Sequence, residues 1–156
     1  MIVSVAVSWV EAPLKRFVDD ARTQLAVLLL PSGQVLGQFG FTRSVDVMTA
    51  CALSAAIHAS ASELGRMVDG TPFTGLHYAG TERQLFLGDV PISGGNLVLL
   101  AVFDDESSIG LVHVFFREFC TAARKAAPAP EAPLQVLSDD FERELNHNLA
   151  VLFGRQ

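Results

Sequence analysis

Two kinds of apolar periodicity divide the first part of the chain into four elements. Residues 1–10 alternate Val with Ser and Ala, a period of two that predicts a short half-buried strand. After Pro13 the period becomes helical, with apolar residues at i, i+3, i+4 and i+7 from Leu14, so we expect an amphipathic helix that begins near this proline. The wholly apolar run 24–30 predicts a central strand, and the alternation over 35–41 predicts its hairpin partner.

The longest predicted helix covers residues 44–68. This stretch has no Pro and its only glycine is Gly65, while Ser44 can cap its beginning and Gly70 with Pro72 can end it. Turn signals separate the three strand-like runs that follow, which are 72–80, 83–89 and 95–103.

The last third of the chain predicts two more helices joined by a proline-rich linker. Apolar residues with helical spacing start at Val112, after the acidic loop 104–106. Residues 127–133 contain three prolines, which exclude an inner strand or a helix, so we expect an extended linker with a reach of roughly 20 Å. Beyond it, Ser138 can cap a terminal amphipathic helix within 134–156.

This order of elements predicts an α/β sandwich in which a mainly antiparallel five-stranded sheet lies between helix layers. A short N-terminal strand and a C-terminal helix are added to it. The expected organisation is therefore a domain over residues 1–126, a Pro/Ala linker over 127–133 and an amphipathic helix over 134–156.

Composition narrows the classes of function. The chain has 156 residues and a net charge of −6, without a basic stripe, which argues against nucleic acid as a partner. The two cysteines lack CxxC spacing, so a reducing cytoplasm is expected. The uninterrupted apolar runs are strand-sized and the first residues carry no positive charge, so we expect neither membrane insertion nor a signal peptide.

The sequence offers no convincing catalytic group, metal site or cofactor site. No phosphate-binding glycine loop follows a strand. Cys51 and His58 would stand about 10.5 Å apart along one helix, too far for a nucleophile and its base. The four histidines fall in four different elements, and the acidic loop 104–106 lacks the ligand spacing of a calcium loop. We therefore expect a protein that is not an enzyme and needs no cofactor.

The long helix is the first candidate interaction surface, because residues 47–62 contain no charge. Alanine is a strong helix former and needs no further reason to be exposed, but depletion of charge is also typical of interface cores. We expect the larger apolar residues to face the sheet, namely Val47, Ala50, Leu53, Ile57, Leu64 and Val68. The residues expected on the outside are then Ala52, Ala55, Ala56, Ala59, Ser60 and Glu63.

A second candidate surface is the run Phe73–Tyr78, which has no charge and no internal proline. At a sheet edge such a strand invites pairing with another copy, and a two-fold axis makes an antiparallel pair self-complementary. We therefore expect a homodimer with an interface formed by Phe73, Thr74, Gly75, Leu76, His77 and Tyr78.

Several segments resemble the roadblock/dynein light-chain family, most closely the bacterial MglB-type proteins that partner a Ras-like GTPase. The resemblance is carried by VSVAVSW before EAPLKRF, the hairpin LAVLLLPSGQVLGQFG, the Ala-rich helix ending in ELG, and NLVLLAVFDDESSIGLV. The linker and terminal helix are similar to the MglB type, whereas the minimal roadblock domain lacks them. One departure is Pro31, where the hairpin turn of the family usually carries an acidic residue.

The resemblance implies a cytoplasmic homodimer that binds an MglA-like small GTPase and stimulates its GTP hydrolysis, as in bacterial cell polarity. The GTPase would dock on the outer residues of the long helix, and the activator would rearrange the GTPase's own catalytic residues. An arginine finger from Arg43 or Arg66 is disfavoured. The terminal helix would make a further contact through Phe141, Leu145, Leu149 and Leu152. The alternatives are a roadblock scaffold without this activity and a small-molecule sensor.

Overall fold

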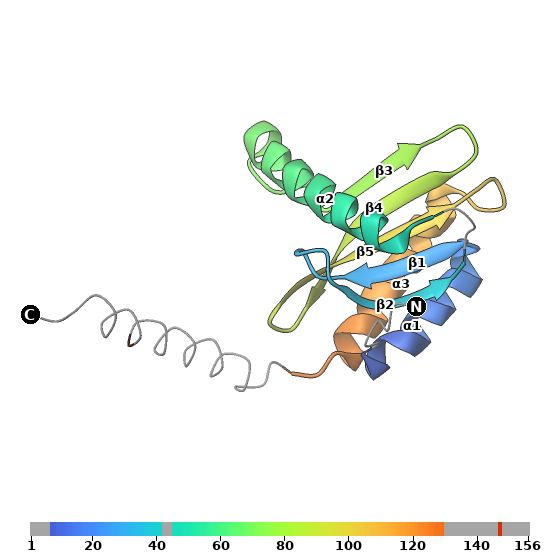
Figure 1. The fold of residues 1–156 in the computed structure, drawn as a ribbon, viewed down its shortest axis with the longest axis horizontal. Coiled ribbons are helices and arrows are strands. Elements are labelled where there is room, and N and C mark those ends of the chain that lie inside the picture. The colour runs from blue at the N-terminus through green and yellow to red at the C-terminus, as the bar shows by residue number, and fades with distance from the viewer. Residues whose placement is uncertain (1–6, 42–44, 130–146, 148–156) are drawn as a thin grey trace, which may run out of the picture.

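The computed structural model describes residues 7–41, 45–129 and 147. Its single sheet has five strands in the order β2-β1-β5-β4-β3, and every neighbouring pair is antiparallel (Figure 1). The elements are α1 (Ser8–Ala21), β1 (Leu25–Leu29), β2 (Val35–Gly40), α2 (Val47–Asp69), β3 (Gly75–Ala79), β4 (Gln84–Ile92), β5 (Gly95–Phe103) and α3 (Ile109–Ala126). The predicted antiparallel five-stranded sheet is confirmed.

Helices cover both faces of this sheet, as expected, but unequally. Helices α1 and α3 lie together on one face, while α2 crosses the other face alone (Figure 1). Because β1 and β5 are buried on both sides, their alternate residues feed two separate cores. Ala26 and Leu28 join the α1–α3 core, whereas Val27 and Leu29 join the α2 core.

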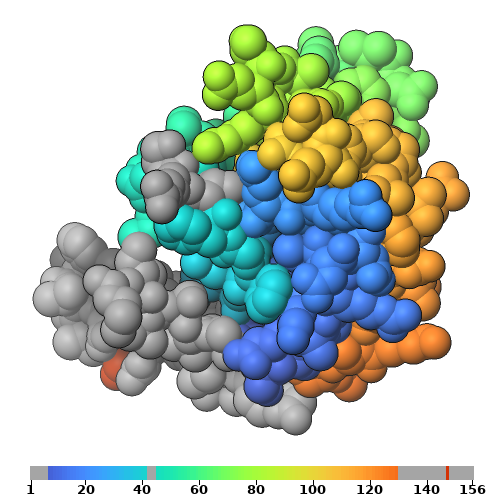
Figure 2. Space-filling view, turned by 90° about the vertical axis from the view of Figure 1, so that its right-hand side faces the viewer, coloured from blue at the N-terminus to red at the C-terminus, as the bar shows by residue number. Residues whose placement is uncertain are grey.

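The α1–α3 layer is built on aromatic packing. Phe17 of α1 meets Phe119 of α3 edge to face, with 5.9 Å between ring centroids. Figure 2 shows the two helices, blue and orange, beside each other along one side of the molecule. Helix α3 begins at its N-cap Ser108, whose side chain accepts a hydrogen bond from the Leu111 amide at 3.1 Å.

The start of the chain differs from the prediction. Helix α1 begins at Ser8, so residues 8–10 are helical rather than part of a strand, and Pro13 lies inside the helix. Val10 explains the shift, because it is buried in the α1–α3 core and extends the apolar stripe that begins again at Leu14. Residues 1–6 of the predicted N-terminal strand lie outside the described residues, as do the predicted cap Ser44, part of the predicted linker (130–133), and 134–146 and 148–156, which contain the predicted contact residues Phe141, Leu145, Leu149 and Leu152.

Strand β4 is longer than the predicted run 83–89 and continues through Pro91, which lies where a turn was expected between 83–89 and 95–103. Pro91 pairs with Asn96 of β5, and the chain turns only at Ser93 and Gly94. The amide of Asp89 donates to the carbonyl oxygen of Thr74, just before β3, at 2.8 Å. The backbone nitrogen of Pro91, two residues later, faces the same side of β4, away from β5, and it lies beyond the residues of β4 that pair with β3. A proline is tolerated there because no ladder bond is lost.

Candidate interaction surface on helix α2 and strand β3

Helix α2 is fixed at both ends by its own sequence. Asp46 is the N-cap, and its carboxylate accepts hydrogen bonds from the hydroxyl and amide of Thr49 and from the Met48 amide. These bonds favour the charged form, so the pKa of Asp46 lies below its usual value. At the other end, Gly70 adopts a left-handed conformation (φ 79°) and its amide donates to Arg66 O.

The fully buried residues of α2 are small, while Val47, Ala50 and Ile57, which were predicted to face the sheet, are partly buried against the same core. The buried residues of α2 are Cys51, Ser54, Ala55 and Gly65. They are separated by three or four residues, or by about three helical turns, so they lie on one side of the helix. Burial raises the pKa of the Cys51 thiol to about 11, so it remains protonated and packs as an apolar group. A face of small residues allows the helix to lie close to the sheet.

The predicted orientation of α2 is therefore wrong in part. Ala55 was expected outside but is only 7% exposed, while Leu53, Leu64 and Val68 were expected on the sheet but are 59%, 53% and 71% exposed. The prediction followed the rule that the largest apolar side chains enter the core. Close packing of small residues, together with one buried polar contact, sets the rotation of the helix instead.

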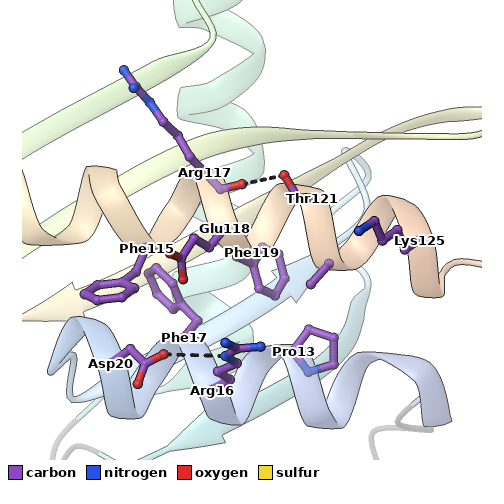
Figure 3. A pocket seen from close by; sticks show the side chains of 11 residues that line it. Pro13, Arg16, Phe17, Asp20, Phe115, Arg117, Glu118, Phe119, Thr121 and Lys125 are labelled. Atoms are coloured by element: carbon purple, nitrogen blue, oxygen red, sulfur yellow. Dashed lines mark hydrogen bonds and ion pairs between the residues drawn. The ribbon is translucent and has the colours of Figure 1, made fainter.

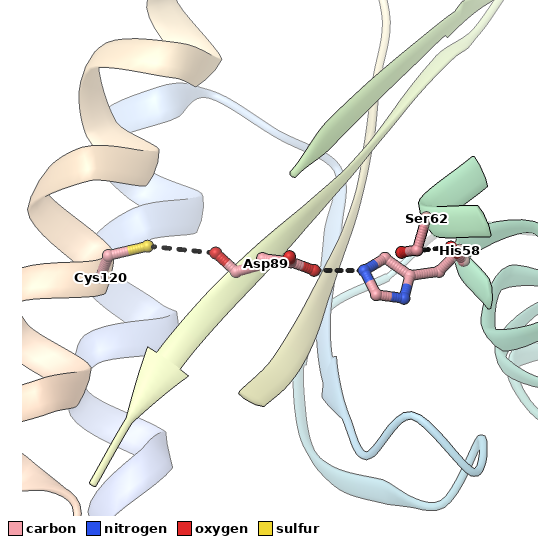
Figure 4. Close-up of polar contacts among 4 residues, drawn as sticks. All are labelled: His58, Ser62, Asp89 and Cys120. Carbon is pink, nitrogen blue, oxygen red and sulfur yellow. Dashed lines mark hydrogen bonds and ion pairs between the residues drawn. The ribbon is translucent and has the colours of Figure 1, made fainter. Parts of the chain in front are cut away.

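That polar contact joins His58 of α2 to Asp89 of β4 (Figure 4). The two side chains are 16% and 15% exposed. Ser62 donates to the carbonyl oxygen of His58 at 2.9 Å, and Cys120 on the opposite face of the sheet donates to the carbonyl oxygen of Asp89 at 3.8 Å. Burial raises the pKa of Cys120 to about 11, which keeps this donor protonated. No local pattern predicts the His58–Asp89 pair, because the two residues are 31 positions apart in different elements.

The outward side of α2 is mainly apolar, although Thr49 and the Glu63–Arg66 ion pair are also exposed on this helix. We define the α2 outer face as its exposed apolar and small residues together with one acid: Met48, Ala52, Leu53, Ala56, Ala59, Ser60, Glu63, Leu64, Met67 and Val68. The five large apolar members are between 53% and 83% exposed. A shallow hollow on this face brings together three of the residues predicted to bind a partner, Ala59, Ser60 and Glu63, beside Leu64 and Met67.

By length and composition alone, α2 could cross a membrane. It has 23 residues, and the mean hydropathy of its most apolar window is 1.2. The expectation that no segment inserts into a membrane was based on uninterrupted apolar runs, and polar residues such as Ser54 and His58 interrupt the apolar residues of α2. One such helix is a weak indication, because core helices of soluble proteins pass the same test. In this structure α2 packs on the sheet through Cys51, Ala55 and His58, so it is part of the folded domain.

Strand β3 lies at the edge of the sheet, as the dimer prediction requires. It pairs with β4 on one side, and no strand among the described residues pairs with its other side. Tyr78 is about half exposed, whereas His77 stacks on Phe103 and shares a hydrogen bond of 2.7 Å with Gln84. Phe73 and Thr74 precede the strand, so β3 itself is shorter than the predicted run.

Gly65 joins the two candidate surfaces. It is buried against the loop that leads into β3, where a Cβ atom would overlap the backbone nitrogen of Phe73 and lie 2.8 Å from the carbonyl oxygen of Thr71. The absence of a side chain lets the second half of α2 rest directly on this loop. The α2 outer face and the free edge of β3 are therefore held in a fixed relation.

The described residues show no metal centre. No group of three or more His, Cys, Asp or Glu side chains within 7–41 and 45–129 is placed to hold an ion. Arg66, one of the two arginines considered as a finger, is paired with Glu63 one turn earlier, and Arg43 lies outside the described residues.

A five-stranded antiparallel sheet with one long helix on one face and two helices on the other is the roadblock-type fold. Solved structures with this fold align over most of the chain. Myxococcus xanthus MglB aligns with 24% identity over 76% of this chain and 94% of its own, with a TM-score of 0.68. A structure described as MglB with a tetrameric arrangement aligns with 19% identity over 81% of this chain and 93% of its own, with a TM-score of 0.69.

A Roadblock/LC7 domain from Streptomyces avermitilis aligns with 17% identity over 72% of this chain and 92% of its own, with a TM-score of 0.63. No family model and no curated protein matches the sequence. At these identities the likeness establishes the fold, and the expected resemblance to MglB-type proteins is confirmed at that level.

Proposed function

We propose that this chain is a cytoplasmic homodimeric regulator that binds a small Ras-like GTPase and stimulates its GTP hydrolysis. It contributes no catalytic residue of its own. The observation that carries this proposal is the α2 outer face, a long apolar surface on a helix that has no charge over residues 47–62.

An apolar surface of this kind favours a protein partner. Exposed contiguous apolar patches are uncommon on proteins that act alone, and they mark interaction sites. Four large side chains within the face, Leu53, Leu64, Met67 and Val68, are each more than half exposed. Small residues between them, such as Ala56 and Ser60, allow a partner's backbone to approach closely.

The free edge of β3 supports self-association beside this face. A second copy related by a two-fold axis would add its own β3 in antiparallel pairing and extend the sheet across both protomers. The outer side of β3 and the second half of α2 are contiguous through Gly65 and Phe73. We therefore assign the dimer interface to the predicted run Phe73–Tyr78, with the second half of α2 beside it.

The GTPase contact is assigned to the exposed members of the predicted platform, which are Ala52, Ala56, Ala59, Ser60 and Glu63. Ala55 is withdrawn from this set because it is buried against the sheet. Arg66 and Glu63 form an exposed ion pair on α2, and we expect stimulation to proceed through reorganisation of the GTPase's own catalytic groups, as the resemblance implies. A partner docked on a rigid helix holds those groups in a productive geometry. The contact of Phe141, Leu145, Leu149 and Leu152 with the GTPase stays a prediction.

The experiment compares Ala56→Arg with the matched control Ala12→Arg, an exposed alanine of α1 on the opposite side of the sheet. GTP turnover by a co-occurring Ras-like GTPase is measured with each protein, and light scattering reports the mass of each complex. Wild type and Ala12→Arg should bind and accelerate turnover, whereas Ala56→Arg should remain dimeric and fail to bind.

The outcomes separate the alternatives. A complex that forms without acceleration identifies a roadblock scaffold and removes the activator function. Undiminished binding by Ala56→Arg removes the platform from α2. If no complex forms with any GTPase tested, a rise in melting temperature with a small molecule would favour the sensor function instead.

A further inference from the structure

Two methionines lie on the α2 outer face, one near each end of the helix. Met67 is 83% exposed, more than any other large apolar side chain in the described part of the protein, and Met48 is 57% exposed. The third methionine of the chain, Met1, lies outside the described residues. A methionine thioether is an apolar group that a mild two-electron oxidant converts into a polar one.

Met67 is placed over the residues predicted to bind a partner. It lines the shallow hollow of the α2 outer face with four other residues, Ala59, Ser60, Glu63 and Leu64. Long side chains of a helix lean toward its N-terminus, so Met67 reaches back over the turn that carries Glu63. By the same rule Met48 leans toward the start of α2 and away from Ala52. Met67, rather than Met48, therefore covers the predicted contact residues.

The two cysteines are poor targets for the same oxidants. Burial raises the pKa of each thiol to about 11, so both stay protonated at neutral pH, whereas the thiolate is the reactive form. Cys51 has no exposed surface, and the thiol of Cys120 is directed at the carbonyl oxygen of Asp89 (Figure 4). Among the described residues, oxidation is therefore expected first on the α2 outer face.

The groove between α1 and α3, on the opposite face of the sheet, offers no comparable target. Figure 3 shows the 11 side chains that line it, and none of them carries a sulfur atom. A mild oxidant therefore changes the surface of α2 and leaves this groove as it was, so the two faces of one molecule respond differently.

We propose that Met67 is an oxidation site that turns off partner binding at the α2 outer face. The inference rests on the proposed function, because it concerns the surface on which the GTPase docks. The thioether sulfur attacks one oxygen of hydrogen peroxide, the O–O bond breaks and a water molecule leaves. The sulfur keeps the oxygen and is oxidised by two electrons, while the peroxide is reduced. A methionine sulfoxide reductase with a thiol as reductant reverses the change and releases water and a disulfide.

A sulfoxide opposes binding because its oxygen is a hydrogen-bond acceptor on a mainly apolar surface. A partner that fits a helix without charge over 47–62 presents apolar atoms there, so docking removes water from the sulfoxide oxygen without replacing the hydrogen bond. That penalty weakens the complex about tenfold. The fold itself is unaffected, because most of the Met67 side chain lies outside the core.

The test compares wild type, Met67→Leu and Met48→Leu before and after treatment with hydrogen peroxide. Leucine has a similar volume and no sulfur, and Met48→Leu is the matched control because it removes a methionine from the same helix. Mass spectrometry measures the sulfoxide at each methionine, and titration with the Ras-like GTPase measures the dissociation constant. Each treated protein is compared with its own untreated sample, so the direct effect of a substitution cancels. Oxidation of Met1 is common to all three proteins.

Treated wild type and treated Met48→Leu should bind about tenfold more weakly, whereas treated Met67→Leu should keep its affinity. Methionine sulfoxide reductase should restore wild type, and the melting temperatures should not change. An equal loss in Met67→Leu would overturn the proposal, as would full affinity of wild type that carries the sulfoxide at Met67. If the untreated proteins bind no GTPase, the proposed function itself is overturned, and this inference with it.

Discussion

The junction between α2 and β3 is most directly tested at Gly65. A methyl group there would overlap the backbone nitrogen of Phe73 and lie 2.8 Å from the carbonyl oxygen of Thr71, so the obstacle is backbone rather than a flexible side chain. Replacing glycine by alanine within a helix normally stabilises it by about 1 kcal/mol. Forcing extra volume into a packed contact costs about 3 kcal/mol when the neighbours cannot move aside. The net expectation for Gly65→Ala is a loss of about 2 kcal/mol.

Gly110 provides the matched control, because it also lies in a helix, and a Cβ atom there would meet only the Ser108 hydroxyl, at 3.9 Å. Urea unfolding measures the free energy difference, and thermal unfolding measures the melting temperatures of both variants. Gly65→Ala should be less stable than wild type, with a melting temperature lower by about 4–8 °C, while Gly110→Ala should be unchanged or more stable. If Gly65→Ala is as stable as Gly110→Ala, the close contact between α2 and the loop before β3 is refuted.

Three further outcomes follow from single contacts. Asp89→Ala should lose about 2 kcal/mol of unfolding free energy because His58 keeps its burial without its acceptor, and the loss should shrink when measured in a His58→Ala background. Asp46→Ala should lower the melting temperature at neutral pH. Because the folded pKa of Asp46 lies below its unfolded value, its contribution is present above the unfolded value and disappears as the pH falls through the folded one, so wild type and variant should converge only in acid, once the pH has fallen below the folded pKa. His77→Pro should weaken dimerisation in light scattering while His77→Ala does not, since the outward amide of His77 is free for a partner strand; equal effects would assign the loss to the side chain.

Local patterns were sufficient for most of the fold. An unbroken apolar run located β1, alternation after a turn located β2, and the apolar spacing from Val112 located α3, because these signals depend on neighbours in the sequence. The cap of α2 was displaced by two residues, from Ser44 to Asp46, because both residue types suit that position. The predicted strand stopped short of Pro91 because β4 can contain a proline only where β3 no longer pairs with it. The residues near Pro91 do not reveal that position.

The interaction surface was harder to predict than the fold. The pair His58–Asp89 forms only after the sheet and α2 are assembled, and it helps to decide which side of the helix turns inward. Three residues of the predicted platform, Ala59, Ser60 and Glu63, meet in one hollow, since Glu63 follows Ala59 by four residues and Ser60 by three. Ala55 was misplaced because an alanine carries too little apolar area for burial rules to assign its side of a helix.

The error about α2 itself bears on function. Assigning Leu53, Leu64 and Val68 to the core assumes that this chain buries its own large apolar residues. The chain leaves them more than half exposed, and covering each would contribute on the order of 1 kcal/mol. That free energy is not used in folding one protomer and is available for association. The residues that contradict an isolated fold are therefore those to which the proposed homodimer or bound partner would give a role.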